Sequence, residues 1–202
     1  MSQNRWIELT ERNPEHSHWY IERFRTMAAN GDDLHGEARF IDAMVSRGAR
    51  ILDAGCGPGR VGGYLATVGH HVVGVDIDPI LIAAAETDHT GPTWLVADLA
   101  ELDLPAAGIA EPFNVIVCAG NVLTFLDPDT RRPVLERLAA HLKSDGRLVT
   151  GFGSGRDYPF DEFLSDVEHA GLAAGQMLAS WDLRPFSSDA DFLVAVLSLS
   201  AS

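Results

Sequence analysis

The sequence predicts an α/β fold in which helices cover both faces of a mainly parallel β-sheet. From Arg50 onward, short β-rich apolar runs alternate with helical patterns, and this alternation is typical of strand–helix–strand units. The apolar runs are nearly continuous, as in strands that are buried on both faces. The chain has 202 residues, 46% hydrophobic and 22% charged, which is enough for one domain with a sizeable core.

The first four predicted strands are apolar runs, and three of them end in an acidic residue. They cover residues 50–53, 71–76, 93–98 and 113–118. Helical patterns follow at 61–68, 79–86 and 128–142. Pro79 suits the first turn of its helix, where a missing N–H costs no hydrogen bond, and Asp78 is the expected N-cap.

The remaining runs complete the predicted sheet. Strands are expected at 147–151, 174–181 and 191–199, with a helix over 158–170. The segment 15–45 predicts two short helices interrupted near Asn30 and Gly31. Because these helices precede the first strand, we expect them to lie over the sheet as a cap. We therefore expect a single domain, residues 1–202, with a helical cap over 1–48 and a core over 49–202.

The formal net charge of -14 argues against nucleic-acid binding, because phosphate recognition needs a cationic surface. The charge is uneven, since residues 1–60 sum to -1 and residues 61–202 to -13. We expect a small-molecule partner and no nucleic-acid partner.

The cysteine usage and hydropathy favour a cytoplasmic protein. Cys56 and Cys118 are not in a CxxC pair, so no metal or redox motif is predicted. Neither a signal-peptide pattern nor an apolar run long enough to cross a bilayer is visible, and no membrane partner is expected.

A glycine-rich loop follows the first predicted strand, in the stretch Asp-Ala-Gly-Cys-Gly-Pro-Gly from Asp53 to Gly59. Glycines let the backbone turn sharply and approach a ligand closely, and the next helix offers free amides at its N-terminus. A dinucleotide site wants G-x-G-x-x-G, but Arg60 occupies the position of the third glycine. The loop therefore disfavours a nucleotide-dependent oxidoreductase, which we keep as an alternative.

Three acids stand at the ends of successive strands around this loop. Asp53, Asp76 and Asp98 are separated by 23 and 22 residues. In doubly wound folds, ligands bind at the carboxyl ends of the strands, and the acid after the second strand accepts hydrogen bonds from ribose hydroxyls. The three acids together favour a nucleoside ligand. A helix cap or a turn remains the alternative for Asp76 and Asp98.

With these motifs the sequence resembles the class I S-adenosylmethionine-dependent methyltransferases. The resemblance rests on Ile-Leu-Asp-Ala-Gly-Cys-Gly-Pro-Gly at 51–59, Gly-Val-Asp-Ile-Asp at 74–78 and Ala-Asp-Leu at 97–99, and it covers about residues 49–200. It implies a Rossmann-like sheet of seven strands in the order 3-2-1-4-5-7-6, with the last strand antiparallel.

The resemblance also implies how the loop would bind the cofactor. Gly55, Gly57 and Gly59 would pack against the methionine and ribose parts of S-adenosylmethionine. Asp53 would meet the methionine amino end, directly or through water. Cys56, which has no sequence partner for nucleophilic chemistry, would be a small packing residue.

The adenosine half would meet the next two strand ends. Asp76 would accept the ribose 2′ and 3′ hydroxyls, and Ile77 would lie against the adenine. Asp98 would accept from the adenine amino group, with Leu99 beside it. Ala119 lies at the end of the fourth strand, where the family places the reactive methyl group and the acceptor.

Two further groups of residues are candidates with open alternatives. In the cap, Tyr20 would lie over the sulfonium and Arg25 would bind the methionine carboxylate, unless that helix only packs its aromatic residues into the core. Asn121, Arg156 and Tyr158 are candidate acceptor residues, unless they are ordinary turn and loop residues.

The predicted function is transfer of a methyl group from S-adenosylmethionine to a small-molecule acceptor, with S-adenosylhomocysteine as the product. The displacement needs alignment and exclusion of water more than a general base, so we name no catalytic residue. A cofactor-binding sensor or partner subunit without turnover is the alternative from another class. The acceptor and the oligomeric state stay open.

Overall fold

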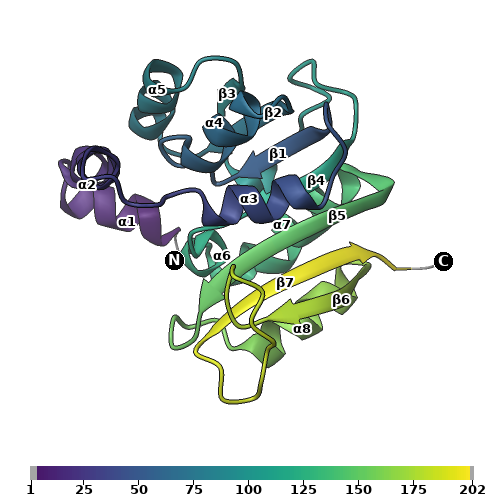
Figure 1. Cartoon of the computed structure of the whole chain (residues 1–202). Coiled ribbons are helices and arrows are strands. Elements are labelled where there is room, and N and C mark those ends of the chain that lie inside the picture. Colours follow the sequence, from purple (N-terminus) through teal and green to yellow (C-terminus); the bar gives the residue numbers. More distant parts are fainter. Residues whose placement is uncertain (1–3, 201–202) are drawn as a thin grey trace.

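A seven-stranded sheet forms the centre of the computed structural model, which describes residues 4–200 (Figure 1). The strands are β1 (Arg50–Ala54), β2 (His71–Asp76), β3 (Thr93–Val96), β4 (Phe113–Cys118), β5 (Leu142–Gly153), β6 (Leu172–Leu178) and β7 (Phe192–Leu199). Their order is β3-β2-β1-β4-β5-β7-β6. The first five strands pair in parallel, whereas β7 runs antiparallel to β5 and β6. The predicted strand order and the antiparallel last strand are therefore confirmed.

Helices cover both faces of this sheet. They are α1 (Arg5–Arg12), α2 (His16–Ala29), α3 (Gly36–Ala43), α4 (Arg60–Thr67), α5 (Pro79–Asp88), α6 (Val122–Phe125), α7 (Arg131–Ala140) and α8 (Phe160–His169), with 3-10 turns η1 (Leu99–Glu101) and η2 (Pro128–Thr130). The expected cap of α5 is present, because Asp78 Oδ1 accepts a hydrogen bond of 2.8 Å from the Ile80 N–H.

Alternating side chains of each strand fill two apolar layers. In β1, Ile51 packs with residues of α3 and α4, whereas Leu52 packs with residues of α7 and α8 on the other face. This alternation follows from the two-residue period of a strand. It leaves the carboxyl ends of the parallel strands free to form a site.

Helices α1 and α2 lie at those carboxyl ends, at the left of the view in Figure 1. Ile21 of α2 packs against Leu81 and Ala84 of α5. Trp6 of α1 donates a hydrogen bond of 2.8 Å from Nε1 to Asp78. Helix α3 instead packs against α4. The boundary between cap and core stays a prediction.

Several element bounds differ from the sequence predictions. Helix α1 was not expected, and the helix predicted over 128–142 begins as the turn η2 and ends at Ala140. Strand β5 begins at Leu142, which pairs with Phe113 before an irregularity in the register. Strand β3 ends two residues before Asp98, which caps η1 instead.

No helix between residues 4 and 200 has the length and hydropathy needed to cross a membrane. Across the same residues, no group of three or more His, Cys, Asp or Glu side chains is arranged to hold a metal ion.

Candidate active site

A cavity of about 520 Å³ lies where β1, β2 and β4 end, against α1 and α2. This volume is within the range of small-molecule and cofactor sites. Most of the candidate residues from the sequence line it, and the structure brings them together from six separate segments. These are Tyr20, Asp53, Gly55, Cys56, Gly57, Asp76, Ile77, Asp98, Leu99, Ala119, Asn121 and Arg156. Gly59, Arg25 and Tyr158 are not part of the lining.

The glycine loop forms the floor of the cavity. Gly55 has a φ of 75°, and a Cβ built on it would lie 2.5 Å from Cγ2 of Val122, so a side chain does not fit there. Gly59 has a φ of 82° and is the N-cap residue of α4. Its role in the structure is to turn the chain into the helix, because L-residues with side chains rarely adopt that conformation.

Asp53 lies beneath the loop and is 2% exposed. Its Oδ2 accepts a hydrogen bond of 2.8 Å from the Gly62 N–H. Burial raises the pKa of Asp53 to about 7, because removal from water penalises the charged form. The carboxyl group can therefore change protonation near neutral pH.

Asp76 connects the end of β2 to the glycine loop. Its Oδ2 accepts a hydrogen bond of 2.8 Å from the Gly57 N–H, and its Oδ1 accepts one of 3.0 Å from the Asp78 N–H. Burial raises the pKa of Asp76 to about 6, and the nearby Asp78 charge adds to this. Each oxygen of a carboxylate has two acceptor positions, so Asp76 keeps capacity for two ligand hydroxyls.

The capping role that the sequence left open for Asp98 is present, whereas its contact with the adenine stays a prediction. Its Oδ1 accepts a hydrogen bond of 2.9 Å from the Ala100 N–H and caps η1, and the residue also lines the cavity. Cys56 packs against Ile82, Ala85 and Trp94. Burial raises the pKa of the Cys56 thiol well above its usual value, so the thiol is a poor nucleophile.

One face of α2 forms the wall opposite the glycine loop. Tyr20, Arg23, Phe24 and Met27 all line the cavity. They are spaced at i, i+3, i+4 and i+7, which places them on one face of a helix. The Tyr20 ring contacts Trp6 and Phe24, with centroids 5.2 Å and 5.0 Å away. Tyr20 is therefore both a packed aromatic and a cavity residue.

Arg25 does not line the cavity, so the structure contradicts the prediction that it binds the cofactor there. Arg25 Nε lies 2.9 Å from Asp88 Oδ2, and Nη1 lies 2.7 Å from Glu22 Oε1, so its guanidinium is held at the surface by two carboxylates. The cavity cations of this region are Arg23, a candidate in the same helix that the sequence analysis ranked below Arg25, and Arg60, which it considered only as a departure from a glycine pattern. The helical spacing from Tyr20 was the signal for Arg23.

Arg60 begins α4 and forms two hydrogen bonds with Glu37, of 2.7 Å and 2.9 Å. Burial opposes ionisation of Glu37, but the hydrogen bonds to Arg60 outweigh it and lower the pKa of Glu37. This partly buried ion pair closes one end of the cavity.

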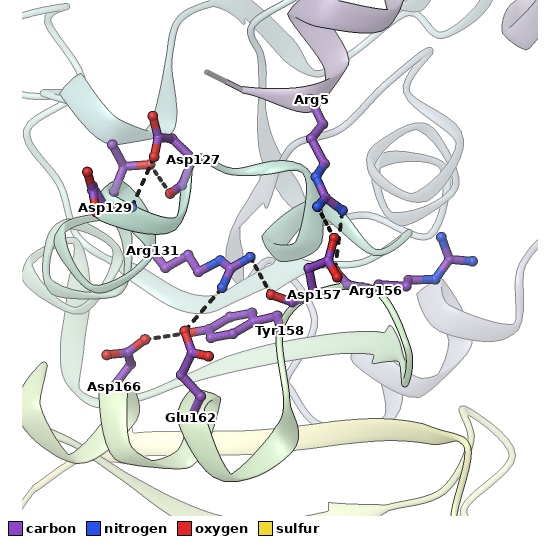
Figure 2. Close-up of polar contacts among 10 residues, drawn as sticks. Arg5, Asp127, Asp129, Arg131, Arg156, Asp157, Tyr158, Glu162 and Asp166 are labelled. Atoms are coloured by element: carbon purple, nitrogen blue, oxygen red, sulfur yellow. Dashed lines mark hydrogen bonds and ion pairs between the residues drawn. The ribbon is translucent and has the colours of Figure 1, made fainter. Parts of the chain in front are cut away.

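Tyr158 is the second candidate that the structure places elsewhere. It is 1% exposed, and its hydroxyl donates a hydrogen bond of 2.9 Å to Asp166. The Arg131 guanidinium lies 4.2 Å from its ring centroid. Tyr158 is thus a core residue that anchors its loop, as Figure 2 shows.

Comparisons with known proteins agree with this geometry. Residues 51–146 match the methyltransferase domain family. The crystal structure of a TehB-like SAM-dependent methyltransferase from Corynebacterium glutamicum is 49% identical, with a TM-score of 0.87 over 93% of this chain and 100% of that one. This chain belongs to the S-adenosylmethionine-dependent methyltransferases. The cofactor of the family is S-adenosylmethionine.

Other relatives match a smaller part of this chain. An uncharacterised methyltransferase of Mycobacterium tuberculosis is 34% identical over 120 residues, which are 58% of this chain and 57% of that protein. A ubiquinone biosynthesis O-methyltransferase of Xylella fastidiosa is 31% identical over 143 residues, or 63% of this chain and 56% of that protein. The chain thus spans little more than half the length of these two relatives.

Proposed function

We propose that this methyltransferase moves the methyl group of S-adenosylmethionine to a small-molecule acceptor and releases S-adenosylhomocysteine. One observation carries the proposal: a single cavity joins the glycine loop, the Asp76 carboxylate and the aromatic face of α2, and it continues past the end of β4. The first three features suit the cofactor, and the continuation leaves room for an acceptor.

The adenosine part of the cofactor fits the β2 and β3 ends. Asp76 has an unused acceptor position on each oxygen, which suits the two ribose hydroxyls. Ile77 and Leu99 are the apolar residues beside the adenine, and Asp98 keeps an oxygen for its amino group.

The methionine part fits the loop and α2. Gly55 and Gly57 leave space for it, and Asp53 accepts from its amino group. Arg23 takes the role first expected of Arg25, because it lies on the cavity face of α2 and can pair with the carboxylate. Tyr20 lies over Gly57 and offers an aromatic face to the sulfonium.

The chain's contribution to the reaction is alignment in a water-poor site. When bound, S-adenosylmethionine supplies an electrophilic methyl group and a neutral thioether leaving group. Ala119 and Asn121 directly follow β4 and line the same cavity. Trp6 of α1 and Phe125 of α6 also line the cavity with ring centroids 5.9 Å apart, and we expect this aromatic contact to limit the access of water.

The remaining parts of the proposal concern partners and location. The acidic charge supports a small-molecule acceptor over a nucleic acid. The two cysteines are buried and free, which fits a proposed cytoplasmic location.

The proposal is tested by calorimetry and by methyl transfer. We expect saturable binding of S-adenosylmethionine and S-adenosylhomocysteine, no competition by NAD, and weaker binding by the Arg23→Gln variant. Asp161→Asn, an exposed change on α8, is the control and should bind normally. Absence of binding would contradict the proposal. Binding without consumption of the cofactor across a metabolite pool would instead favour a sensor or partner subunit.

A further inference from the structure

Two polar side chains of the cavity lining meet near the carboxyl ends of β4 and β5. Asn121 follows β4 and Arg156 follows β5, and both line the cavity. A Cβ built on Gly153 would lie 3.4 Å from Arg156 Nε and 3.8 Å from Asn121 Oδ1. The two side chains therefore converge over one glycine, although they come from different loops.

The groups that these side chains leave unused are hydrogen-bond donors. Asn121 Oδ1 already accepts a hydrogen bond of 2.8 Å from the Gly153 N–H, which leaves its amide NH2. Arg156 is exposed to solvent as well as lining the cavity, and within residues 4–200 its guanidinium has no hydrogen bond or ion pair. Figure 2 shows the Arg156 side chain extending away from the neighbouring Arg5–Asp157 pair. Donors without an acceptor partner suit an anionic oxygen group.

Side chains from two other elements contact the loop that carries Arg156. These contacts fix the position of the backbone at this arginine. Arg131, which is 2% exposed, donates a hydrogen bond of 2.8 Å from Nη2 to the Asp157 carbonyl. Arg5 of α1 pairs with the Asp157 carboxylate and donates to the Arg156 carbonyl.

The charge of the rest of the cavity restricts the anion. Five carboxyl groups line the other parts of the cavity, from Asp33, Glu37, Asp53, Asp76 and Asp98, and they outnumber the two cations there, Arg23 and Arg60. A dianion would be repelled by these groups more strongly than a monoanion. A carboxylate carries one negative charge and has two coplanar oxygens. One guanidinium can neutralise that charge and donate a hydrogen bond to each oxygen.

We propose that the methyl acceptor carries a carboxylate, which Arg156 and the Asn121 amide bind as a recognition group. The inference rests on the proposed function, because it places the acceptor in the same cavity as the cofactor. It makes Arg156 a specificity-determining residue, with Arg5 and Arg131 as positioning residues for its loop.

The test titrates benzoate, benzamide and inorganic phosphate into the protein saturated with S-adenosylhomocysteine, by ligand-observed NMR or calorimetry. The variants are Arg156→Gln, Arg156→Lys and the control Arg184→Gln, since Arg184 is an exposed loop arginine that does not line the cavity. We expect benzoate to bind saturably and more tightly than benzamide or phosphate. Arg156→Gln should weaken benzoate binding about tenfold, Arg156→Lys less, and Arg184→Gln not at all.

Affinity for S-adenosylhomocysteine is measured first on each variant and should not change. If the wild-type protein did not bind S-adenosylhomocysteine, the proposed function would be refuted. With that affinity intact, equal benzoate binding by wild type and Arg156→Gln would overturn the carboxylate site. Tighter binding of phosphate or benzamide, or no saturable binding of benzoate, would also overturn it.

Discussion

Protonation of Asp76 is expected to control the affinity for the cofactor. Its two oxygens already accept hydrogen bonds from the Gly57 and Asp78 N–H groups, and burial raises its pKa to about 6. Ribose hydroxyls donate more strongly to a carboxylate than to a neutral carboxyl group. Binding therefore favours the ionised form and weakens as the pH falls through about 6.

The size of the effect follows from the ionised fraction. With a pKa of about 6, only about one tenth of the Asp76 side chains are ionised at pH 5, whereas nearly all are at pH 8. The dissociation constant should thus rise about tenfold between pH 8 and pH 5, which corresponds to about 1.4 kcal/mol. Asp53 has a pKa of about 7, so its contact with the methionine amino group should add a separate change in the dissociation constant nearer neutral pH.

The assay is calorimetry with S-adenosylhomocysteine at pH 5, 6, 7 and 8, on wild type, Asp76→Asn and Asp53→Asn. Asp76→Asn should weaken binding at pH 8 by roughly 1.5–3 kcal/mol and should remove the step near pH 6. Asp53→Asn should leave that step in place. Wild-type affinity in a folded Asp76→Asn protein, or a wild-type affinity that is flat across this range, would refute the reasoning.

Three further predictions concern stability. Because burial raises the pKa of Asp53 to about 7, the native state binds more protons than the unfolded chain between about pH 4 and 7. The free energy of unfolding should fall as pH rises through that window, and urea melts of Asp53→Asn should show a shallower fall. Gly74→Ala would place a Cβ 2.1 Å from a β3 indole ring and should cost about 1–3 kcal/mol in such melts. Gly36→Ala, with no atom within 4 Å, should not destabilise the protein. Trp6→Phe removes a partly buried donor to the carboxylate that caps α5 and should expose the α1–α2 turn to limited proteolysis; unchanged cleavage would contradict this.

The regular core was predictable because its signals are local. The apolar runs and the Pro79 and Asp78 pair determine where strands end and where α5 begins, within neighbouring residues of the chain. Helix α1 also has a local signal that the sequence analysis did not use, because the Asn4 side chain caps it by accepting a hydrogen bond from the Trp6 N–H. Its place depends on contacts of Trp6 with Asp78 and Phe125, which are distant in the sequence.

In the candidate site, too, some features follow from local sequence signals and others from contacts between distant residues. Asp53, Asp76 and Asp98 follow strands that end at one edge of the sheet, so their meeting in one cavity follows from the topology. Arg23 and Arg25 differ by only two positions, and the rotation of α2 decides which one reaches the cavity. That rotation is set by Ile21 packing against α5, a tertiary contact.

The fold class, the glycine loop with its strand-end acids and, through the family resemblance, the strand order could all be predicted from the sequence alone. These features depend on short motifs whose geometry is nearly independent of the rest of the chain. The burial of Tyr158 and the place of Arg156 in the cavity lining follow from three-dimensional contacts instead. Arg131 and Arg5 contact the loop that carries both residues from distant positions in the chain, so no local signal in the sequence indicates these contacts.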